Sequence, residues 1–168
     1  MIIQCDTRQK RKHHDLKERY FEEQGHKLVH SKMLVGDYCV PSNCSVVVDT
    51  KADLSELYSN LIQQHKRFRS ECILAQEAGI KLYILVENKN GIRSLEDVEK
   101  WKNPQFFRYY KAKRKAERMG LKEPKPPASN VQLIKIMHAM TRDYGVEFLF
   151  CTPQESGSKV IELLTKGV

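Results

Sequence analysis

The segment Met33–Leu54, MLVGDYCVPSNCSVVVDTKADL, places charged side chains directly beside an apolar strand. Its run of three valines ends in Asp49, Thr50 and Lys51, and a second acid, Asp37, lies one hairpin earlier. Burying charges at the end of an apolar strand costs several kcal/mol unless a partner compensates for the lost water. The segment therefore predicts a β-hairpin that carries a polar site at one end.

The spacing of these charged residues predicts the kind of site. Residues two apart on a strand point to the same face, roughly 6–7 Å apart, so Asp49 and Lys51 should project together while Thr50 faces away. Asp37, on the neighbouring strand, can reach the same volume. Two close carboxylates repel each other unless they share a proton or hold a cation, and such oxygen ligands suit Mg²⁺ or Mn²⁺. With a lysine to orient or deprotonate water, the group predicts phosphodiester hydrolysis; a Gly-Asp turn beside a solvated ion pair is the alternative.

Regular elements are predicted outward from this hairpin. Strands are expected at residues 2–5, 27–33, 38–40, 45–50, 81–86 and 147–151. Helices are expected at about 15–24, 53–78, from 94, at 103–119, 130–144 and 152–165. Because the strands first cluster and then alternate with helices, the pattern predicts an α/β fold with a mixed central β-sheet flanked by helices on both faces.

Composition limits the partners and the compartment. The 168 residues fit one domain, residues 1–168, with a basic helical insertion at about 94–128. A formal net charge of +8 indicates a polyanionic partner. The five cysteines form no CxxC pair, which is typical of a reducing, intracellular setting, cytoplasmic or nucleoid-associated in a bacterium or virus. No apolar run is long enough to cross a bilayer, and the N-terminus lacks a secretory h-region, so no membrane partner is expected.

Several short motifs occur along the chain in an order that is characteristic of one protein family. IIQCDTRQ, GDY, VVVDTK, a helix with Arg67-Phe68-Arg69-x-Glu71 and KLYILVEN occupy about residues 1–90, and a helix–strand–helix pattern resumes at QLIKIMHAM. Together they resemble the XPF-type nuclease domain of the restriction-endonuclease-like PD-(D/E)XK superfamily. The resemblance implies a Mg²⁺-dependent endodeoxyribonuclease, with Mn²⁺ able to substitute, that acts on branched DNA (flaps, forks or junctions) in repair, recombination or replication.

The resemblance also implies roles by position. Asp37 and Asp49 match the metal-binding acids of the family, and Lys51 matches its catalytic lysine. Asp6 and Arg8 match an early Asp-x-Arg, in which the acid contributes to the metal site and the arginine holds phosphate. These five residues form the implied catalytic set, with Asp6, Asp37 and Asp49 as metal ligands.

The chain departs from the family pattern at three positions. Thr50 replaces the motif arginine, Gln9 stands where glutamate is usual, and Ser55 stands where the motif has its last acid. Asp53 and Glu56 are nearby acids, each of which is either a helix cap or a member of the site. Because the two acids and the lysine of the core motif are retained, an active enzyme is expected.

The insertion carries the densest charge. Residues 100–125 contain ten Lys or Arg, two acids and five aromatic residues. Cations can hold phosphates, whereas the aromatic rings either stack on unpaired bases or pack the helix on the domain. The cations predicted to contact DNA, here and on the helix after the DTK motif, are Arg67, Arg69, Lys111, Lys113, Arg114 and Lys115.

Partners and rival functions remain open at this point. The tandem helix-hairpin-helix domain of eukaryotic relatives does not follow, so the insertion or a DNA-binding partner protein is expected to hold DNA. Homodimerisation through the terminal helices is a further possibility, with Leu163 and Leu164 forming either a dimer face or a core contact. The alternatives are a Holliday-junction resolvase or restriction-like duplex nuclease of the same fold, and a catalytically silent DNA-binding scaffold subunit. Glu87 has no assigned role, and His13 and His14 are expected at the surface.

Overall fold

The central sheet is mixed. The computed structural model describes residues 1–8 and 11–166, without the side chains of residues 11 and 12; Gln9 lies outside the described residues. The strands are β1 (Ile2–Cys5), β2 (Lys27–His30), β3 (Tyr38–Val40), β4 (Asn43–Lys51), β5 (Lys81–Glu87) and β6 (Glu147–Cys151), in the spatial order β2-β1-β3-β4-β5-β6. β3 pairs antiparallel with β1 and β4, whereas β1–β2, β4–β5 and β5–β6 are parallel.

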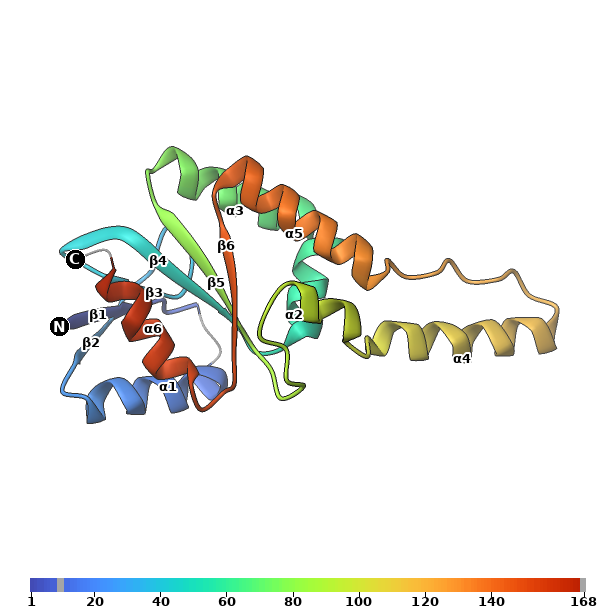
Figure 1. Ribbon diagram of the computed structural model, residues 1–168, viewed down its shortest axis with the longest axis horizontal. Coiled ribbons are helices and arrows are strands. Elements are labelled where there is room, and N and C mark those ends of the chain that lie inside the picture. The colour runs from blue at the N-terminus through green and yellow to red at the C-terminus, as the bar shows by residue number, and fades with distance from the viewer. Residues whose placement is uncertain (9–10, 167–168) are drawn as a thin grey trace.

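Helices cover both faces of this sheet (Figure 1), which confirms the predicted fold class. One layer is α1 (Arg11–Glu23) with α6 (Ser156–Thr165), and the other is α2 (Leu54–Tyr58), the π-helical turn η1 (Ser59–Gln63), α3 (His65–Glu77) and α5 (Asn130–Tyr144). The remaining helix, α4 (Pro104–Met119), projects away from the sheet. Leu163 and Leu164 are buried in the core beneath α6, so they are core contacts and not an exposed apolar face.

The two central strands divide the core into two. Val47 and Ile84 join the core beneath α2, α3 and α5, whereas Val48 and Leu85 join the core beneath α1 and α6. Successive residues of a strand point to opposite faces, and here both faces are covered. This explains why β4 and β5 read as continuous apolar runs without alternation.

The helix predicted over 53–78 is broken into three segments. Gln64 adopts a non-helical φ of −112° and ψ of 27° between η1 and α3. Its N–H donates to the Ser59 carbonyl, five residues back, at 2.8 Å. One turn earlier, the buried Asn60 side chain donates to the Glu56 carbonyl at 2.8 Å. A side-chain amide that competes for a helix carbonyl widens the local turn, which the apolar spacing alone does not reveal.

Other predicted boundaries also differ. The strand predicted over 27–33 ends at His30, the first helix begins at Arg11, the helix predicted from 94 is a 3₁₀ turn, η2 (Glu96–Lys100), and the last helix begins at Ser156. Thr152 and Glu155 form a reciprocal cap, since each side chain accepts a hydrogen bond from the other's backbone N–H, but regular turns start one residue after Glu155. Among the described residues, no helix combines the length and apolar character that crossing a bilayer requires.

Glu87, at the end of β5, is part of a buried ionic contact. Lys17 on α1 forms an ion pair with the Glu87 carboxylate and also donates to the His13 carbonyl at 2.8 Å. Ser156, the first residue of α6, donates to the same Glu87 oxygen at 2.8 Å. All three side chains are buried. Glu87 therefore joins α1, β5 and α6, a structural role that the sequence did not assign.

We predict that replacing Lys17 alone destabilises the fold. Lys17→Met should leave the Glu87 carboxylate buried without a counter-charge and cost about 3–5 kcal/mol. The double variant Lys17→Met/Glu87→Gln should recover most of the loss, because the amide stays neutral and can still accept from Ser156. Urea unfolding followed by the fluorescence of Trp101 measures both, with Lys159→Met at the exposed Lys159–Glu162 pair as control. Equal losses in the single and double variants would contradict this role.

Candidate active site

A cleft of about 660 Å³ opens where β1 and β4 end. The residues of the implied catalytic set that line it are Asp6, Arg8, Asp37, Asp49 and Lys51. Its walls include side chains from α1 on one side and from the segment α2–η1–α3 on the other. The structure therefore brings all five residues together, although they come from three separate parts of the chain.

Gly36 sets the position of Asp37. Its φ of +66° is a left-handed conformation that favours glycine, and a Cβ added there would lie 2.4 Å from the Cγ1 atom of Val47. The Asp37 N–H then donates to the Val48 carbonyl at 3.0 Å, and the Asp37 carbonyl accepts from the Asp6 N–H at 2.9 Å. Backbone bonds thus tie Asp37 to the strands on both sides.

Thr50 holds the carboxylate of Asp37. Its backbone N–H and its hydroxyl each donate to Asp37 Oδ2 at 2.7 Å. The prediction that Thr50 faces away is therefore wrong: Asp37 precedes the first residue of β3, so it lies across the end of β4 and outside the regular strand register. Desolvation, followed by the negative charge of Asp49, raises the pKa of Asp37 to about 7, against the hydrogen bonds of Thr50 and the charge of Lys51.

Lys51 and Asp49 form a close ion pair. Lys51 Nζ lies 2.7 Å from Asp49 Oδ2, and both side chains are nearly inaccessible to solvent. Burial by itself lowers the pKa of Lys51, but the adjacent Asp49 outweighs burial and raises it overall. Lys51 therefore carries a positive charge at neutral pH, so it can orient a water or a phosphate oxygen but not remove a proton.

Asp6 is engaged by Arg8. Both carboxylate oxygens of Asp6 accept from the Arg8 guanidinium, and Oδ1 also accepts from the Arg8 backbone N–H at 2.9 Å. Burial raises the pKa of Asp6, but the hydrogen bonds and charge of Arg8 outweigh burial and lower it. Arg8 also donates to the Met33 carbonyl at 2.8 Å and keeps about half of its side chain exposed. The pair is neutral overall, but the half-exposed Arg8 side chain still lines the cleft.

Glu71 on α3 is a further acid in the cleft; it belongs to the Arg67-Phe68-Arg69-x-Glu71 motif but had no assigned role. Burial, followed by the charge of Asp49, raises the pKa of Glu71, while Arg67, Lys51 and Arg8 oppose this shift. Glu71 therefore lies within electrostatic reach of the central acid and lysine. The available signal was its spacing of four from Arg67, which places both on one helix face. Asp37, Asp49 and Glu71 all line the cleft, although among the described residues their carboxylate oxygens do not gather into one three-ligand cluster.

The predicted DNA-contacting cations fall in different places. Arg67 is exposed and lines the cleft. Arg69 lies elsewhere, because its guanidinium stacks over the ring of Tyr144 on α5 and donates to the tyrosine hydroxyl. The four remaining cations, Lys111, Lys113, Arg114 and Lys115, lie on α4 and are not among the residues that line the cleft.

The two acids after Lys51 act as caps. Asp53 Oδ1 accepts from the Glu56 N–H at 2.8 Å, and Glu56 Oε2 accepts from the Ala52 N–H at 2.7 Å. Glu56 also lines the cleft, whereas Asp53 does not. His14 is buried and not at the surface as predicted, because its Nδ1 atom shares a hydrogen bond with the Tyr38 hydroxyl beneath α1. Burial accordingly lowers the pKa of His14 to about 4.

The mixed six-stranded sheet has counterparts among solved structures. Two solved structures of XPF from Aeropyrum pernix match it, each with a TM-score of 0.61. The structure in complex with DNA is 19% identical in sequence, and the match covers 98% of this chain and 64% of the XPF chain. The second structure is 17% identical, and the match covers 99% of this chain and 61% of the XPF chain. The present chain therefore spans less than two thirds of either.

Comparison with protein families gives the same result from the sequence. The ERCC4 domain matches residues 5–164, and the chain belongs to the ERCC4 domain family. No curated protein sequence matches. The resemblance to the XPF-type nuclease domain is thus confirmed, and the family match spans residues 5–164.

We predict that Gly36→Ala destabilises the hairpin more than a glycine replacement of equal strain. The left-handed conformation costs alanine about 1–2 kcal/mol, and the contact with Val47 adds to this. Gly79→Ala is the matched control, since Gly79 has φ +68° with no heavy atom within 4 Å of the added Cβ. The difference between the two variants in urea unfolding measures the contact with Val47. Equal destabilisation would show that Gly36 acts through its backbone angle alone.

Proposed function

We propose that this protein is a Mg²⁺-dependent endonuclease that cuts branched DNA. The observation that carries the proposal is the meeting of Asp37, Asp49 and Lys51 in one cleft of an ERCC4-family chain. XPF from Aeropyrum pernix, which shares the fold, is described in complex with DNA, and the formal net charge of +8 supports the same substrate. The preference for branched DNA rests on family membership.

The cleft suits a divalent cation. Desolvation and then the charge of Asp49 raise the pKa of Asp37 to about 7, so the second carboxylate opposes the ionisation of the first. A hard cation compensates for such repulsion. Asp37 and Asp49 would hold the ion, with Glu71 beside them and Asp6 at the edge. When bound, Mg²⁺ supplies charge stabilisation at the phosphate that is cut; Mn²⁺ has similar ligand preferences.

The chain's own residues divide the remaining tasks. Lys51, kept protonated by Asp49, donates to the attacking water or to a phosphate oxygen and stabilises the charge that develops there. Thr50 fixes the orientation of the Asp37 carboxylate through two hydrogen bonds. Arg8 and Arg67 keep exposed guanidinium groups at the edge of the cleft, where they can bind the flanking phosphates.

We expect cleavage of labelled flap or fork DNA in Mg²⁺ but not in EDTA. Asp37→Asn and Lys51→Met should each reduce the rate by roughly 10²-fold or more, because the first weakens the hold on the metal ion and the second removes a positive charge beside the reacting phosphate. Asp143→Asn is the matched control: it neutralises an exposed acid at the end of α5 that is not among the residues that line the cleft. Cleavage that survives Asp37→Asn or Lys51→Met would remove the proposed site.

The same substrate panel separates the rival functions. Preferential cutting of a four-way junction would indicate a resolvase, and cutting of blunt duplex at the same rate would indicate a restriction-like nuclease. A wild-type protein that binds forked DNA but cuts it in neither Mg²⁺ nor Mn²⁺ would be a scaffold subunit.

We expect Glu71→Gln to weaken metal use more than it weakens the fold. Removing this carboxylate should raise the Mg²⁺ concentration needed for half-maximal cleavage by roughly 10-fold, the lower range for a group that supports a metal site. Glu77→Gln, at the other end of α3, provides the control, because Glu77 does not line the cleft. An unchanged Mg²⁺ titration would exclude Glu71 from the ion's surroundings.

A further inference from the structure

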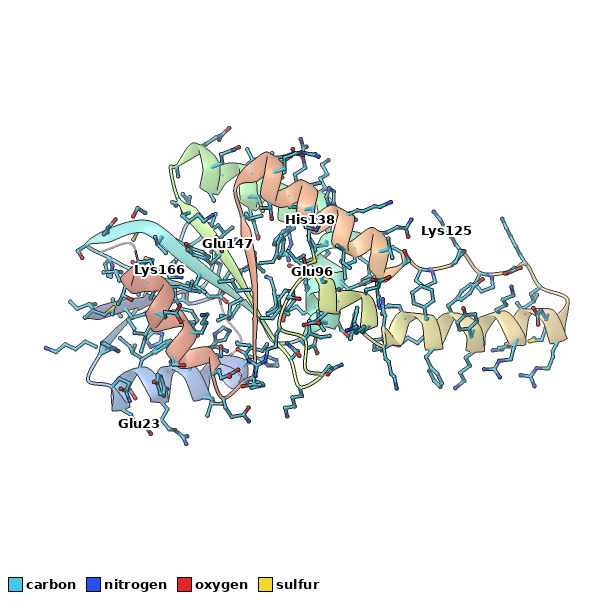
Figure 2. All side chains as sticks on the ribbon, viewed as in Figure 1. Glu23, Glu96, Lys125, His138, Glu147 and Lys166 are labelled. Carbon is cyan, nitrogen blue, oxygen red and sulfur yellow. The ribbon has the colours of Figure 1, made fainter. Side chains whose placement is uncertain are left out.

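α4 and the chain that follows it form an arm, residues 104–129, that extends from the body (Figure 1). Asn103 caps α4 through a hydrogen bond to the Gln105 N–H, and Gly120 ends it in a left-handed conformation. Residues 120–129 then run back along one side of the helix as an irregular segment, the return segment. Figure 2 shows side chains projecting from the opposite side of α4, away from this segment, which carries Lys125.

The inner face of α4 is occupied by contacts within the arm. The Tyr109 hydroxyl donates to Glu123 at 3.0 Å, and Lys113 forms an ion pair with the same carboxylate at 2.7 Å. The Leu121 N–H donates to the carbonyl of the buried Ala116 at 2.9 Å. Lys113, one of the predicted DNA contacts, therefore serves mainly to hold the return segment against the helix.

The outer face presents aromatic rings that support no core. Phe107 is 73% exposed and Tyr110 is 54% exposed. With Arg114 they lie at positions i, i+3 and i+7, on one side of the helix. They line a groove of about 370 Å³, together with Lys113 and Glu117. Two neighbouring exposed rings beside a groove are typical of a surface that binds a ligand.

The charge of α4 selects the class of ligand. The helix carries six Lys or Arg and one acid, Glu117. At 100° per residue, Lys111, Lys115 and Arg118 fall on the same outer side as Phe107. A second copy of this chain is a poor complement, because its formal net charge is also +8. A nucleic acid matches both features, since its phosphates meet the cations and its bases have flat apolar faces.

The exposed rings of Phe107 and Tyr110 favour a nucleic acid with unpaired bases over a duplex. In a duplex the bases are stacked on one another and present only their edges in the grooves. Phe107 and Tyr110 are side chains of a straight helix that could contact the duplex backbone but could not reach between stacked base pairs without unstacking them. In a single strand each base has a free face, and stacking on an aromatic side chain tolerates any sequence.

The base of the arm adjoins the cleft. A second cavity, of about 320 Å³, lies between the start of α2 and the start of α4 and is lined by Lys102 and Pro104 among others. Ala52, the residue after Lys51, lines both this cavity and the active-site cleft. The cleft and the base of the arm are therefore neighbouring parts of the surface.

We propose that the outer face of α4 binds the single-stranded segment of the substrate, with bases stacked on Phe107 and Tyr110 and phosphates on Lys111, Arg114 and Lys115. This inference rests on the proposed nuclease function, because the proposed substrate, branched DNA, contains single-stranded segments. It assigns the binding of such a segment to the arm. Binding through the arm requires no metal ion, so it can be measured apart from cleavage.

The test is fluorescence anisotropy of a labelled 20-nucleotide oligothymidine in EDTA, with a blunt duplex as the second probe. Phe107→Ala/Tyr110→Ala should weaken oligothymidine binding by roughly 5- to 150-fold, the contribution of about one stacked base, and leave duplex binding nearly unchanged. Met119→Ala/Leu121→Ala is the matched control, because these side chains are equally exposed but do not line the groove. Far-UV circular dichroism checks that α4 remains folded.

A second measurement addresses the cations. Arg114→Gln should reduce the salt dependence of oligothymidine binding by about 0.7 in log–log slope, the value for one single-strand phosphate, whereas Lys135→Gln on α5 should not. Unchanged oligothymidine binding in the double aromatic variant, or equal losses for oligothymidine and duplex, would overturn the proposal. Cleavage of flap DNA in Mg²⁺ is scored separately. A wild-type protein that binds through the arm but never cuts would refute the nuclease function and not the arm site.

Discussion

The repulsion between Asp37 and Asp49 constrains the cleft, because their carboxylates meet at adjoining strand ends where little water reaches them. Burial, followed by the negative charge of Asp49, raises the pKa of Asp37 to about 7. The chain offsets the repulsion locally: Thr50 donates two hydrogen bonds to Asp37, and Lys51 forms an ion pair with Asp49. Each of these residues lies within two positions of Asp49. The groups that compensate for the two buried acids thus follow directly after Asp49 in the sequence. On the proposed function, a bound cation would supply the positive charge that is still missing.

Buried ionic contacts also hold the walls that face this site. Lys17 reaches from α1 to Glu87 on β5, and Ser156 of α6 shares the same carboxylate. A buried ion pair is weak evidence for stability, because desolvation can exceed the attraction. Its effect here is better understood as positional, since Lys17 and His14 both line the cleft. The contact holds α1 in a fixed position against β5, the strand that pairs with β4.

The sequence predicted the sheet well because its signals are local. The valines of β4 and the run KLYILV of β5 are continuous and apolar, as strands covered on both faces must be. The position of Thr50 was mispredicted because the two-residue rule holds within a regular ladder, and Asp37 lies just outside it. The partner of Glu87 lies 70 residues away, and no local pattern could identify it. Glu71 had no predicted role for a similar reason, because its closeness to Asp49 depends on how α3 packs over the sheet.

Helix interruptions were also beyond the sequence signal. The apolar spacing over 53–78 is continuous, yet Asn60 and Gln64 divide the segment into three. The division has a consequence for the site, since both of these residues line the cleft. The π turn separates α2 from α3. Side chains from both helices and from the turn between them can therefore line the same cleft.

Charge is divided between the cleft and the arm in a way that suits a nuclease. In the cleft, Asp6 is paired with Arg8 and Asp49 with Lys51, so much of the local positive charge is already neutralised. α4, by contrast, carries six cations and a single acid, so it is the part of the described chain best suited to long-range attraction for a polyanion. On the proposed function, separating the two tasks would keep the cations that attract DNA from neutralising the acids that hold a metal ion.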